Sequence, residues 1–411
     1  MQDIKKGGMP IISQLISYIP LDLIDKAVSE FNSDKSYKKL KTKEHLVFML
    51  YGVVGKLESL NGLIRSLPFL GKALIYFGIT ELPARSTFAD ANRNRKSDVF
   101  GKLYSLLVEH YKNQLSGSYL SGLIDKKIDM KRVKIFDSTT FTLFVDVFTG
   151  SGRNKIEGKK KGGIKAHVLL SLHSLIPEIV WMSAASKNDK DFLGQLKPLK
   201  GEIYVFDKGY VNYNYYYNWT EMGVFFVTRL NDNASYEVIE QKTILERDAE
   251  IDGILTDQII SLKTDKGPLK ARIITLKSLT TGKTYTFVSN LFNVAATTIA
   301  KLYKNRWEIE PFFKQLKQNF ELKGFYSDSK EGIKTQVWIA MIANLIFTVI
   351  HRQIKQAESF SAMVQMARVN LGSYIRFIDV LKIKYWRANE KNIEKIQLNL
   401  FQQWEGVVLK I

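Results

Sequence analysis

The sequence predicts a mixed α/β protein in which helical regions precede and follow a core of strands and helices. The evidence is the spacing of apolar residues along the 411-residue chain. Up to about residue 125 they recur at three- and four-residue steps, the spacing of amphipathic helices. From about residue 130 they form short runs of strand length, and the helical spacing returns near residue 295. We therefore divide the chain into residues 1–125 (helical), 126–229 and 293–350 (α/β core), 230–292 (β-rich insertion) and 351–411 (helical).

The helical first segment contains a stretch with the composition of a DNA-reading helix. Residues 83–96 (PARSTFADANRNRK) follow a glycine-containing turn, and Ser86 or Thr87 is placed to cap a helix there. A basic helix after such a turn is typical of a helix-turn-helix arrangement. A solvated surface helix explains the pattern equally well. The basic residues that we expect to face DNA are Arg85, Arg93 and Arg95.

Short apolar runs predict the strands of the core. A helix is expected at residues 189–199, and a Tyr- and Asn-rich helix follows the glycine turn at Gly209. Three strands, a helix, a strand, a helical stretch and a further strand make a mixed α/β sheet. The predicted strands are residues 132–137, 164–173, 178–182, 202–207 and 224–229.

Residues 230–292 interrupt this order. They hold strand-like pieces such as ARIITLKSL and TYTFVSNLF between polar turns, so we predict a β-rich insertion. The helical pattern resumes at Ala295 and continues in the tail. The longest uncharged apolar run, residues 337–350, has 14 residues. That is too short to cross a bilayer, so it predicts a buried helix and no membrane partner.

The charge balance favours a polyanionic partner. The chain has 60 Lys and Arg against 41 Asp and Glu, a net charge of +19, which favours nucleic acid first and a membrane surface second. A basic protein without such a partner is the alternative. There are no cysteines, which excludes disulfides, thiolate zinc sites and a cysteine nucleophile. No apolar stretch of a secretory signal follows Met1, so we expect a cytoplasmic protein.

Residues 303–317 (YKNRWEIEPFFKQLK) are the most informative segment. If they form one helix, four polar side chains fall within an arc of about 60°. The opposite stripe is apolar and suited to burial: Leu302, Ile309, Phe312, Leu316 and Phe320. An ordinary i,i+4 pair of Arg306 with Glu310 on a solvated face is the competing explanation, and Pro311 can kink the segment. The four polar residues are Tyr303, Arg306, Glu310 and Lys317.

Two predicted strands end in an acid, in Ile-Phe-Asp137 and Val-Phe-Asp207. Carboxylates at strand ends of an α/β sheet can converge where ligands bind. If Glu310 packs against them, three like charges meet, and they repel one another unless cations intervene. Oxygen-only ligands select Mg²⁺ or Mn²⁺, and two such ions can activate an attacking oxygen and stabilise a leaving one at phosphorus. The five histidines show no ligand spacing, and we expect His167 and His173 to be structural.

These motifs together resemble a known family. The spacing Tyr303-x2-Arg306-x3-Glu310-x6-Lys317 is similar to the YREK signature of bacterial insertion-sequence transposases of the DDE type. The residues after Asp137 (Ser-Thr) and after Asp207 (Lys-Gly-Tyr) resemble the first and second acidic motifs of that group. The resemblance covers about residues 130–350, and it implies a ribonuclease H-like core interrupted by the insertion.

The resemblance also implies roles for these residues. Asp137, Asp207 and Glu310 would be the catalytic metal ligands, for two Mg²⁺ or Mn²⁺ ions. Arg306 and Lys317 would contact the DNA phosphate near the cleaved end. Tyr303 would hydrogen-bond the same backbone or have an architectural role. Relatives hold a flipped base with an aromatic residue of the insertion, for which Tyr285 is our candidate here, although a core aromatic is the stronger interpretation.

A basic loop lies between the first two predicted strands. Its charges would follow a DNA backbone, with a solvated charged hairpin as the alternative. The residues concerned are Arg153, Lys155, Lys159, Lys160 and Lys161, with Lys165 at the start of the next strand.

We therefore predict a DNA transposase of an insertion sequence. It would bind the terminal inverted repeats of its element, join them to target DNA, and act as a homodimer at the bacterial nucleoid. Metal-activated water would cut the DNA, and the freed 3′ hydroxyl would attack a target phosphodiester. The alternatives are a domesticated nuclease of the same fold and a catalytically silent DNA-binding regulator.

Overall fold

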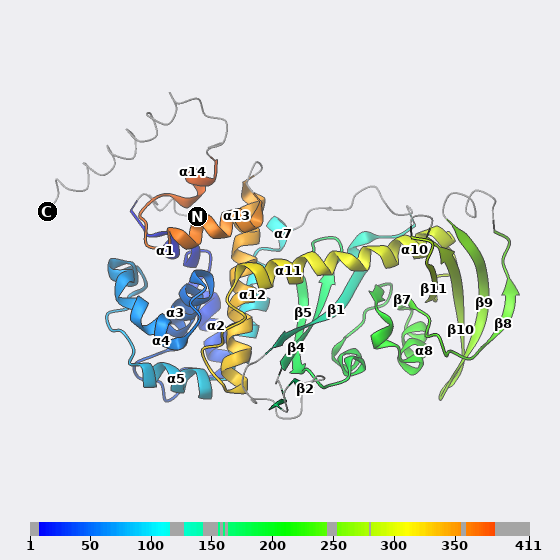
Figure 1. The fold of residues 1–411 in the computed structure, drawn as a ribbon, viewed down its shortest axis with the longest axis horizontal. Helices are drawn as coiled ribbons and strands as arrows, with labels where there is room; N and C mark the ends of the chain where they lie inside the picture. Colours follow the sequence, from blue (N-terminus) through cyan, green and yellow to red (C-terminus); the bar gives the residue numbers. More distant parts are fainter. Residues whose placement is uncertain are drawn as a thin grey trace, which may run out of the picture.

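The computed structural model describes residues 8–115, 127–142, 155–156, 159–160, 163–244, 253–278, 281–354 and 359–382 (Figure 1). A large sheet forms one half of the molecule, and a group of helices forms the other half (Figure 1). The mixed α/β core between helical regions is thus confirmed.

The first five core strands form a ribonuclease H-like sheet. The strand with Asp137, β1, pairs antiparallel with β4, and β4 pairs antiparallel with β5. On its other side β1 pairs in parallel with β6, and β6 pairs in parallel with β7. Three antiparallel strands followed by two parallel ones, in this order, are the ribonuclease H-like arrangement. The strands are β1 (Val133–Thr142), β4 (Gly163–Ser171), β5 (Pro177–Ala184), β6 (Ile203–Phe206) and β7 (Phe225–Arg229).

The β-rich insertion extends this sheet. Strand β11 pairs antiparallel with β7, so all nine strands form one sheet in the order β5-β4-β1-β6-β7-β11-β10-β9-β8. The β-rich prediction is confirmed, and the continuity with the core is a feature that local sequence could not show. The added strands are β8 (Tyr236–Gln241), β9 (Ile254–Thr264), β10 (Gly267–Lys277) and β11 (Thr284–Ser289).

Helices cover both faces of the sheet. Because side chains alternate along a strand, Ile135 enters one core and its neighbour Phe136 enters another on the opposite face. The first core contains the helices α10 (Ala296–Asn305) and α11 (Ile309–Asn319), which run across the strands (Figure 1). The second contains α8 (Tyr213–Glu221) and the 3₁₀ helix η3 (Asp189–Gln195).

Helix α12 (Lys330–Gln353) is the centre of the helical half. Ser329 caps it by accepting a hydrogen bond from the Gly332 N–H. By length and composition α12 could cross a membrane, but 83% of its most apolar window is buried against other helices. The buried helix predicted for residues 337–350 is therefore confirmed. Its partners include α3 (Thr42–Gly55), α5 (Arg85–Asn94), α6 (Asp98–His110) and α13 (Phe360–Val369).

The predicted DNA-reading segment is helical as α5, with differences from the expectation. Ala84 is its N-cap, so neither Ser86 nor Thr87 caps it. A bent 3₁₀ helix, η1 (Leu67–Phe77), stands between α4 (Leu60–Ser66) and α5, so α4 and α5 are not joined by a short turn. The remaining described helices are α1 (Ile11–Ile16), α2 (Leu21–Phe31), α7 (Lys112–Leu115) and α14 (Phe377–Lys382).

Candidate active site

Asp137 and Asp207 lie next to each other on paired strands: Asp207 follows the last residue of β6, whereas Asp137 lies within β1, which continues to Thr142. Strands β1 and β6 are parallel, and Phe136 stands opposite Phe206 in their register. The next residue on each strand is the aspartate, so the two carboxylates are neighbours. The two carboxylates converge as we inferred, but the prediction that the first strand ends at Asp137 was wrong. Beyond Asp137, β1 loses its pairing with β6 and continues to Thr142 paired with β4.

The third carboxylate comes from the helix that crosses the sheet. Glu310 lies in the first turn of α11, which packs on β1. Burial raises the pKa of Asp137, and the negative charges of Asp207 and Glu310 raise it further. The Ser138 N–H and the Arg306 guanidinium oppose this rise in the pKa. The three carboxylates therefore share one electrostatic environment.

The basic and phenolic residues of the 303–317 segment contact the acidic strands directly. Arg306 Nη1 donates to Asp137 Oδ2 at 2.6 Å, and the Tyr303 hydroxyl donates to Asp207 Oδ1 at 2.9 Å. Burial and the charge of Asp207 raise the pKa of Tyr303, so this hydroxyl stays protonated and remains a donor. Lys317 Nζ donates to the Thr140 carbonyl on β1 at 3.0 Å. Both aspartates are thus held by side chains of the crossing helices.

The crossing segment is not one continuous helix. A 3₁₀ turn, η5 (Arg306–Glu308), separates α10 from α11, so the arc argument holds only approximately. Pro311 lies in the first turn of α11, where a missing N–H is tolerated, so it does not break the helix. Tyr303 and Arg306 are buried, each 6% exposed, whereas Glu310 and Lys317 are exposed. The apolar stripe is buried as predicted: Leu302, Ile309, Phe312, Leu316 and Phe320.

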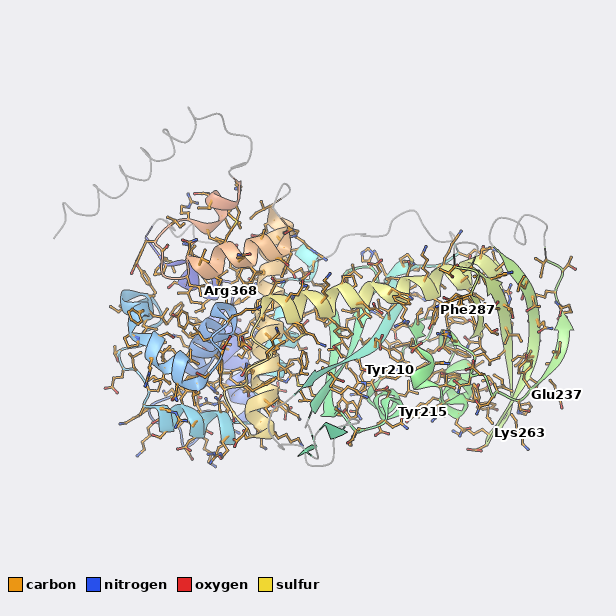
Figure 2. All side chains as sticks on the ribbon, in the orientation of Figure 1. Tyr210, Tyr215, Glu237, Lys263, Phe287 and Arg368 are labelled. Carbon is orange, nitrogen blue, oxygen red and sulfur yellow. The ribbon has the colours of Figure 1, made fainter. Side chains whose placement is uncertain are left out.

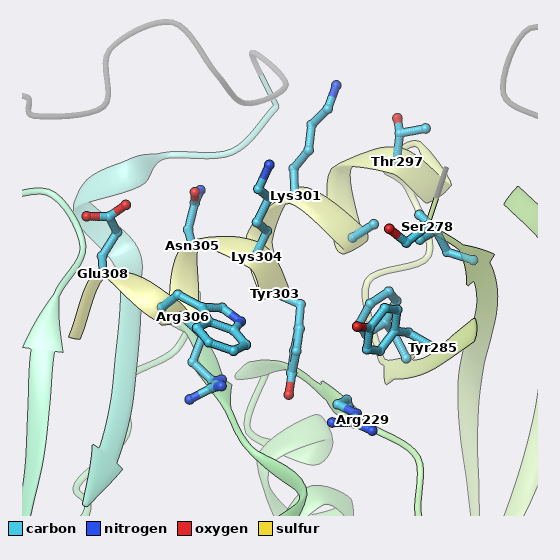
Figure 3. Close-up of a pocket in the computed structure, with 14 residues that line it drawn as sticks. Arg229, Ser278, Tyr285, Thr297, Lys301, Tyr303, Lys304, Asn305, Arg306 and Glu308 are labelled. Carbon is cyan, nitrogen blue, oxygen red and sulfur yellow. The ribbon is translucent and has the colours of Figure 1, made fainter. Parts of the chain in front are cut away.

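A cavity of about 630 Å³ opens beside the carboxylates, between α10 and the insertion (Figure 3). The Arg229 guanidinium lies 5.5 Å from the centre of the Tyr285 ring, and the Phe287 ring lies 4.9 Å from the Tyr303 ring. Phe287 lies under the crossing helix (Figure 2). Trp307 is 56% exposed at the cavity rim. Cations and aromatic rings share its lining: Arg229, Tyr285, Phe287, Lys301, Lys304 and Trp307, together with Tyr303 and Arg306.

The other predicted DNA-binding residues are only partly described. Arg153 and Lys161 lie outside the described residues. The backbone of Lys155, Lys159 and Lys160 forms the short strands β2 (Lys155–Ile156) and β3 (Lys159–Lys160), which pair antiparallel. In the helical half, Arg85 and Arg93 are exposed on α5.

Arg95 differs from our expectation. It is 2% exposed, and its guanidinium donates to the Leu40 carbonyl at 2.7 Å and contacts His45 Nδ1 at 2.8 Å. It also lies 4.1 Å from the centre of the Tyr37 ring. These contacts give Arg95 a structural role, because a guanidinium enclosed in this way has no free donor face for a phosphate.

A metal ion at these carboxylates would share their oxygens with the present donors or replace them. Within the described ranges, no three His, Asp or Glu side chains are already arranged as a metal-binding group. The donor set nevertheless suits a hard cation, since it consists of oxygens and its charges repel one another. Arg306 and Tyr303 supply hydrogen-bond donors to two of these carboxylates, Asp137 and Asp207.

Residues 129–346, over half of the chain, match the family described as the transposase DDE domain. The chain belongs to the DDE transposase family. Residues 7–80 match a second family, described as a domain of unknown function. Like other DDE transposases, the enzyme acts on DNA and depends on divalent metal for cleavage and strand transfer.

Two relatives named as transposases agree with this assignment. This transposase is 29% identical to the Sinorhizobium fredii protein y4zB, which is named as a transposase, over 66% of the chain and 72% of y4zB. It is 22% identical to a Geobacillus stearothermophilus protein named as the transposase of insertion sequence element IS5377, over 85% of the chain and 86% of that protein. A piggyBac transposase synaptic complex with hairpin DNA aligns with a TM-score of 0.42 at 12% identity, covering 96% of this chain and 86% of that one.

The sequence patterns missed several residues of the transposase site. Arg229 is the last residue of β7, and Lys304 and Trp307 lie within residues 303–317, but none of the three belongs to the spaced pattern used for the prediction. Arg229 could have been noticed as a charge at the end of a predicted strand, as Asp207 was. The cavity itself depends on how the insertion packs against α10, which no local pattern encodes.

Proposed function

We propose that this transposase binds the terminal inverted repeats of its element and uses Asp137, Asp207 and Glu310 to hold two Mg²⁺ or Mn²⁺ ions. The observation that carries this proposal is the shared electrostatic environment of the three carboxylates. Asp207 and Glu310 both raise the pKa of Asp137, so each lies close enough to disfavour the ionisation of Asp137. Cations would relieve that repulsion, and oxygen ligands match the preferences of both metals.

When bound, such ions supply an activated oxygen nucleophile and a stabilised leaving oxygen at phosphorus. The remaining tasks belong to the side chains. Arg306 would bind a non-bridging phosphate oxygen pair through its planar guanidinium. Lys317 would act as a point charge on the same phosphate, since it is exposed beside β1. Tyr303, fixed on Asp207, would orient that carboxylate and face the DNA backbone with its ring edge.

The cavity beside the carboxylates suits an unpaired base next to the cleaved phosphate. Aromatic rings provide stacking surfaces that tolerate any base, and cations contribute to such sites. Tyr285 and Phe287 stack with their ring centres 6.4 Å apart, and Arg229 covers Tyr285. Trp307 is exposed enough to take part. We propose this cavity as the place where a base near the transposon end is held during cleavage.

Longer-range contacts with DNA would come from the basic surfaces. The net charge of +19 provides the electrostatic attraction. Arg85 and Arg93 on α5 are exposed and would contact a phosphate backbone. We assign the same role to Lys155, Lys159 and Lys160 on β2 and β3. We further propose a homodimer that brings two transposon ends and the target together, acting where the DNA lies, at the bacterial nucleoid.

Strand transfer tests this function. The purified protein is incubated with labelled DNA of the sequences that flank its gene and a supercoiled target plasmid, in Mg²⁺, Mn²⁺ or EDTA. The expected result is metal-dependent nicking at the repeat boundary followed by joining to the plasmid. Cutting without joining would indicate the nuclease, and binding without cutting in either metal would indicate the silent regulator.

A further inference from the structure

A chain of buried hydrogen bonds lies behind the carboxylates, on the opposite face of the sheet. His167 on β4 is fully buried, and both of its ring nitrogens have partners. Nδ1 lies 3.1 Å from the Tyr210 hydroxyl, and Nε2 lies 3.4 Å from Ser183 Oγ. The Tyr210 hydroxyl is also hydrogen-bonded to the Ser138 side chain. Tyr210 is 1% exposed and belongs to the core opposite α10 and α11 (Figure 2).

Which atom donates in each of these hydrogen bonds follows from the contacts of Ser183. Ser183 Oγ donates its single proton to the Ala184 carbonyl at 3.2 Å, so it accepts from His167 Nε2–H. A neutral imidazole protonated on Nε2 has a free lone pair on Nδ1, which accepts from the Tyr210 hydroxyl. Burial lowers the pKa of His167 to about 4, which keeps the ring neutral at pH 7. Ser138 then donates to Tyr210, and every member is satisfied.

Both ends of the Ser138–Tyr210 contact belong to elements that carry a catalytic aspartate. Ser138 follows Asp137, and its N–H donates to Asp137 Oδ1 at 2.8 Å. Tyr210 ends the 3₁₀ turn η4 (Lys208–Tyr210) that begins after Asp207, and its N–H donates to the Asp207 carbonyl at 3.1 Å. The Tyr210 hydroxyl thus connects the turn bearing one aspartate to the strand bearing the other.

Packing leaves the rings of this chain little freedom. The Tyr210 ring stands at 90° to Phe136 with centres 4.9 Å apart. His167 stacks on Phe192 at 5.3 Å and lies 5.1 Å from Trp181. In such an apolar setting a hydroxyl without a partner costs about 1–3 kcal/mol. The hydrogen bonds to Ser138 and His167 avoid that cost for the Tyr210 hydroxyl.

We propose that His167 is a positioning residue for the transposition reaction. Through Tyr210 and Ser138 it fixes the distance and angle between the strand that carries Asp137 and the turn that carries Asp207. Two carboxylates that share metal ions need a set spacing, and supporting hydrogen bonds provide it. The inference rests on the proposed role of Asp137 and Asp207 as metal ligands. It makes His167 a participant in activity even though it touches neither the carboxylates nor DNA.

The test compares Tyr210→Phe, which removes one hydroxyl, with the matched control Tyr104→Phe. Tyr104 is also buried, and its hydroxyl donates to the Pro177 carbonyl at 3.2 Å, away from the carboxylates. Mn²⁺ binding is measured by calorimetry, and nicking of end DNA is measured across a Mg²⁺ titration. Loss of supporting hydrogen bonds at metal sites costs about 10- to 100-fold in affinity or activity. We expect that loss in Tyr210→Phe with unchanged end binding, and no such loss in Tyr104→Phe.

Two His167 variants complete the test. His167→Leu removes the acceptor and should weaken Mn²⁺ binding as Tyr210→Phe does. His167→Asn keeps an acceptor near the position of Nδ1 and should recover part of the affinity, which a merely structural role would not predict. Mn²⁺ binding and nicking in Tyr210→Phe equal to those of Tyr104→Phe would overturn the inference while leaving the transposase function intact. A wild-type protein that binds no Mn²⁺ and cuts no DNA would instead refute the proposed metal site.

Discussion

Arg306 forms an ion pair with Asp137, so replacing Arg306 should alter stability and metal affinity in opposite directions. We consider Arg306→Gln, which removes the charge but keeps a long polar side chain. The Arg306 side chain is 8% exposed and that of Asp137 is 23% exposed. In wild type, a metal ion at Asp137 would compete with this guanidinium for Oδ2. In the variant this competition is removed.

The size of the effect follows from this geometry. Breaking a fully buried pair costs about 3–5 kcal/mol. The partial exposure of Asp137 lowers that figure, and Arg306 Nε is itself buried without a hydrogen-bond partner in the described part of the chain, a cost that glutamine removes. A hydrogen bond to a charged group contributes about 1.5–3 kcal/mol, so we expect the free energy of unfolding of Arg306→Gln to be lower by about 2 kcal/mol. At about 2.1 cal/mol/K per residue, the Tm of the metal-free protein would fall by about 2 °C.

Calorimetric melting with and without Mn²⁺ measures both effects, and Lys304→Gln is the matched control. Lys304 is an exposed cation at the same cavity that contacts neither aspartate. If the full 2 kcal/mol is recovered on metal binding, the Mn²⁺ affinity of Arg306→Gln rises by up to about 30-fold. An unchanged Tm without metal, or equal Mn²⁺ affinity in both proteins, would refute the view that Arg306 and metal compete for Asp137.

Three further predictions concern other parts of the molecule. Tyr303→Phe removes the donor to Asp207 Oδ1, so metal-free stability should fall by about 1.5 kcal/mol in urea unfolding, and an unchanged midpoint would contradict that contact. Lys317→Ala should weaken end binding equally for all sequences and reduce the slope of log affinity against log salt by about one, whereas an unchanged slope would remove Lys317 from the phosphate contacts. Burial and the charge of Arg95 lower the pKa of His45 to about 3, below its unfolded value of 6.5. The contribution of neutral His45 to the free energy of unfolding is therefore fully present above pH 6.5 and falls as the pH falls, by about 3 kcal/mol at pH 4.5. Urea unfolding of His45→Gln at several pH values should lack this part of the pH dependence.

Local sequence patterns predicted the elements of this fold because each element has a strong periodic signal. The apolar runs before Asp137 and Asp207 became β1 and β6, and the apolar stripe along the crossing helices is buried. The two carboxylates could be placed together because each follows a similar apolar run, and the parallel register of β1 and β6 brings the residues after Phe136 and Phe206 side by side.

The features of the site that the sequence did not predict depend on contacts between residues far apart in the chain. Arg306 and Asp137 are 169 positions apart, so their ion pair is decided by how α11 packs on β1 and not by either motif. Composition indicated that Arg95 is a basic residue of a DNA-reading helix. In the structure Arg95 is the C-cap of α5, and its guanidinium is buried against the distant residues Leu40 and His45. The same holds for His167, whose role depends on the register that places it opposite Ser138.

Cleavage by Glu310→Gln tests the central claim most directly. Labelled DNA carrying the element's ends is incubated with wild type, Glu310→Gln or the neighbouring control Glu308→Gln, in Mg²⁺ or EDTA, and end binding is measured in parallel. We expect wild type and Glu308→Gln to nick the repeat boundary only with Mg²⁺, and Glu310→Gln to bind the ends without nicking them. Nicking by Glu310→Gln at the wild-type rate would contradict the assignment of Asp137, Asp207 and Glu310 as the catalytic carboxylates.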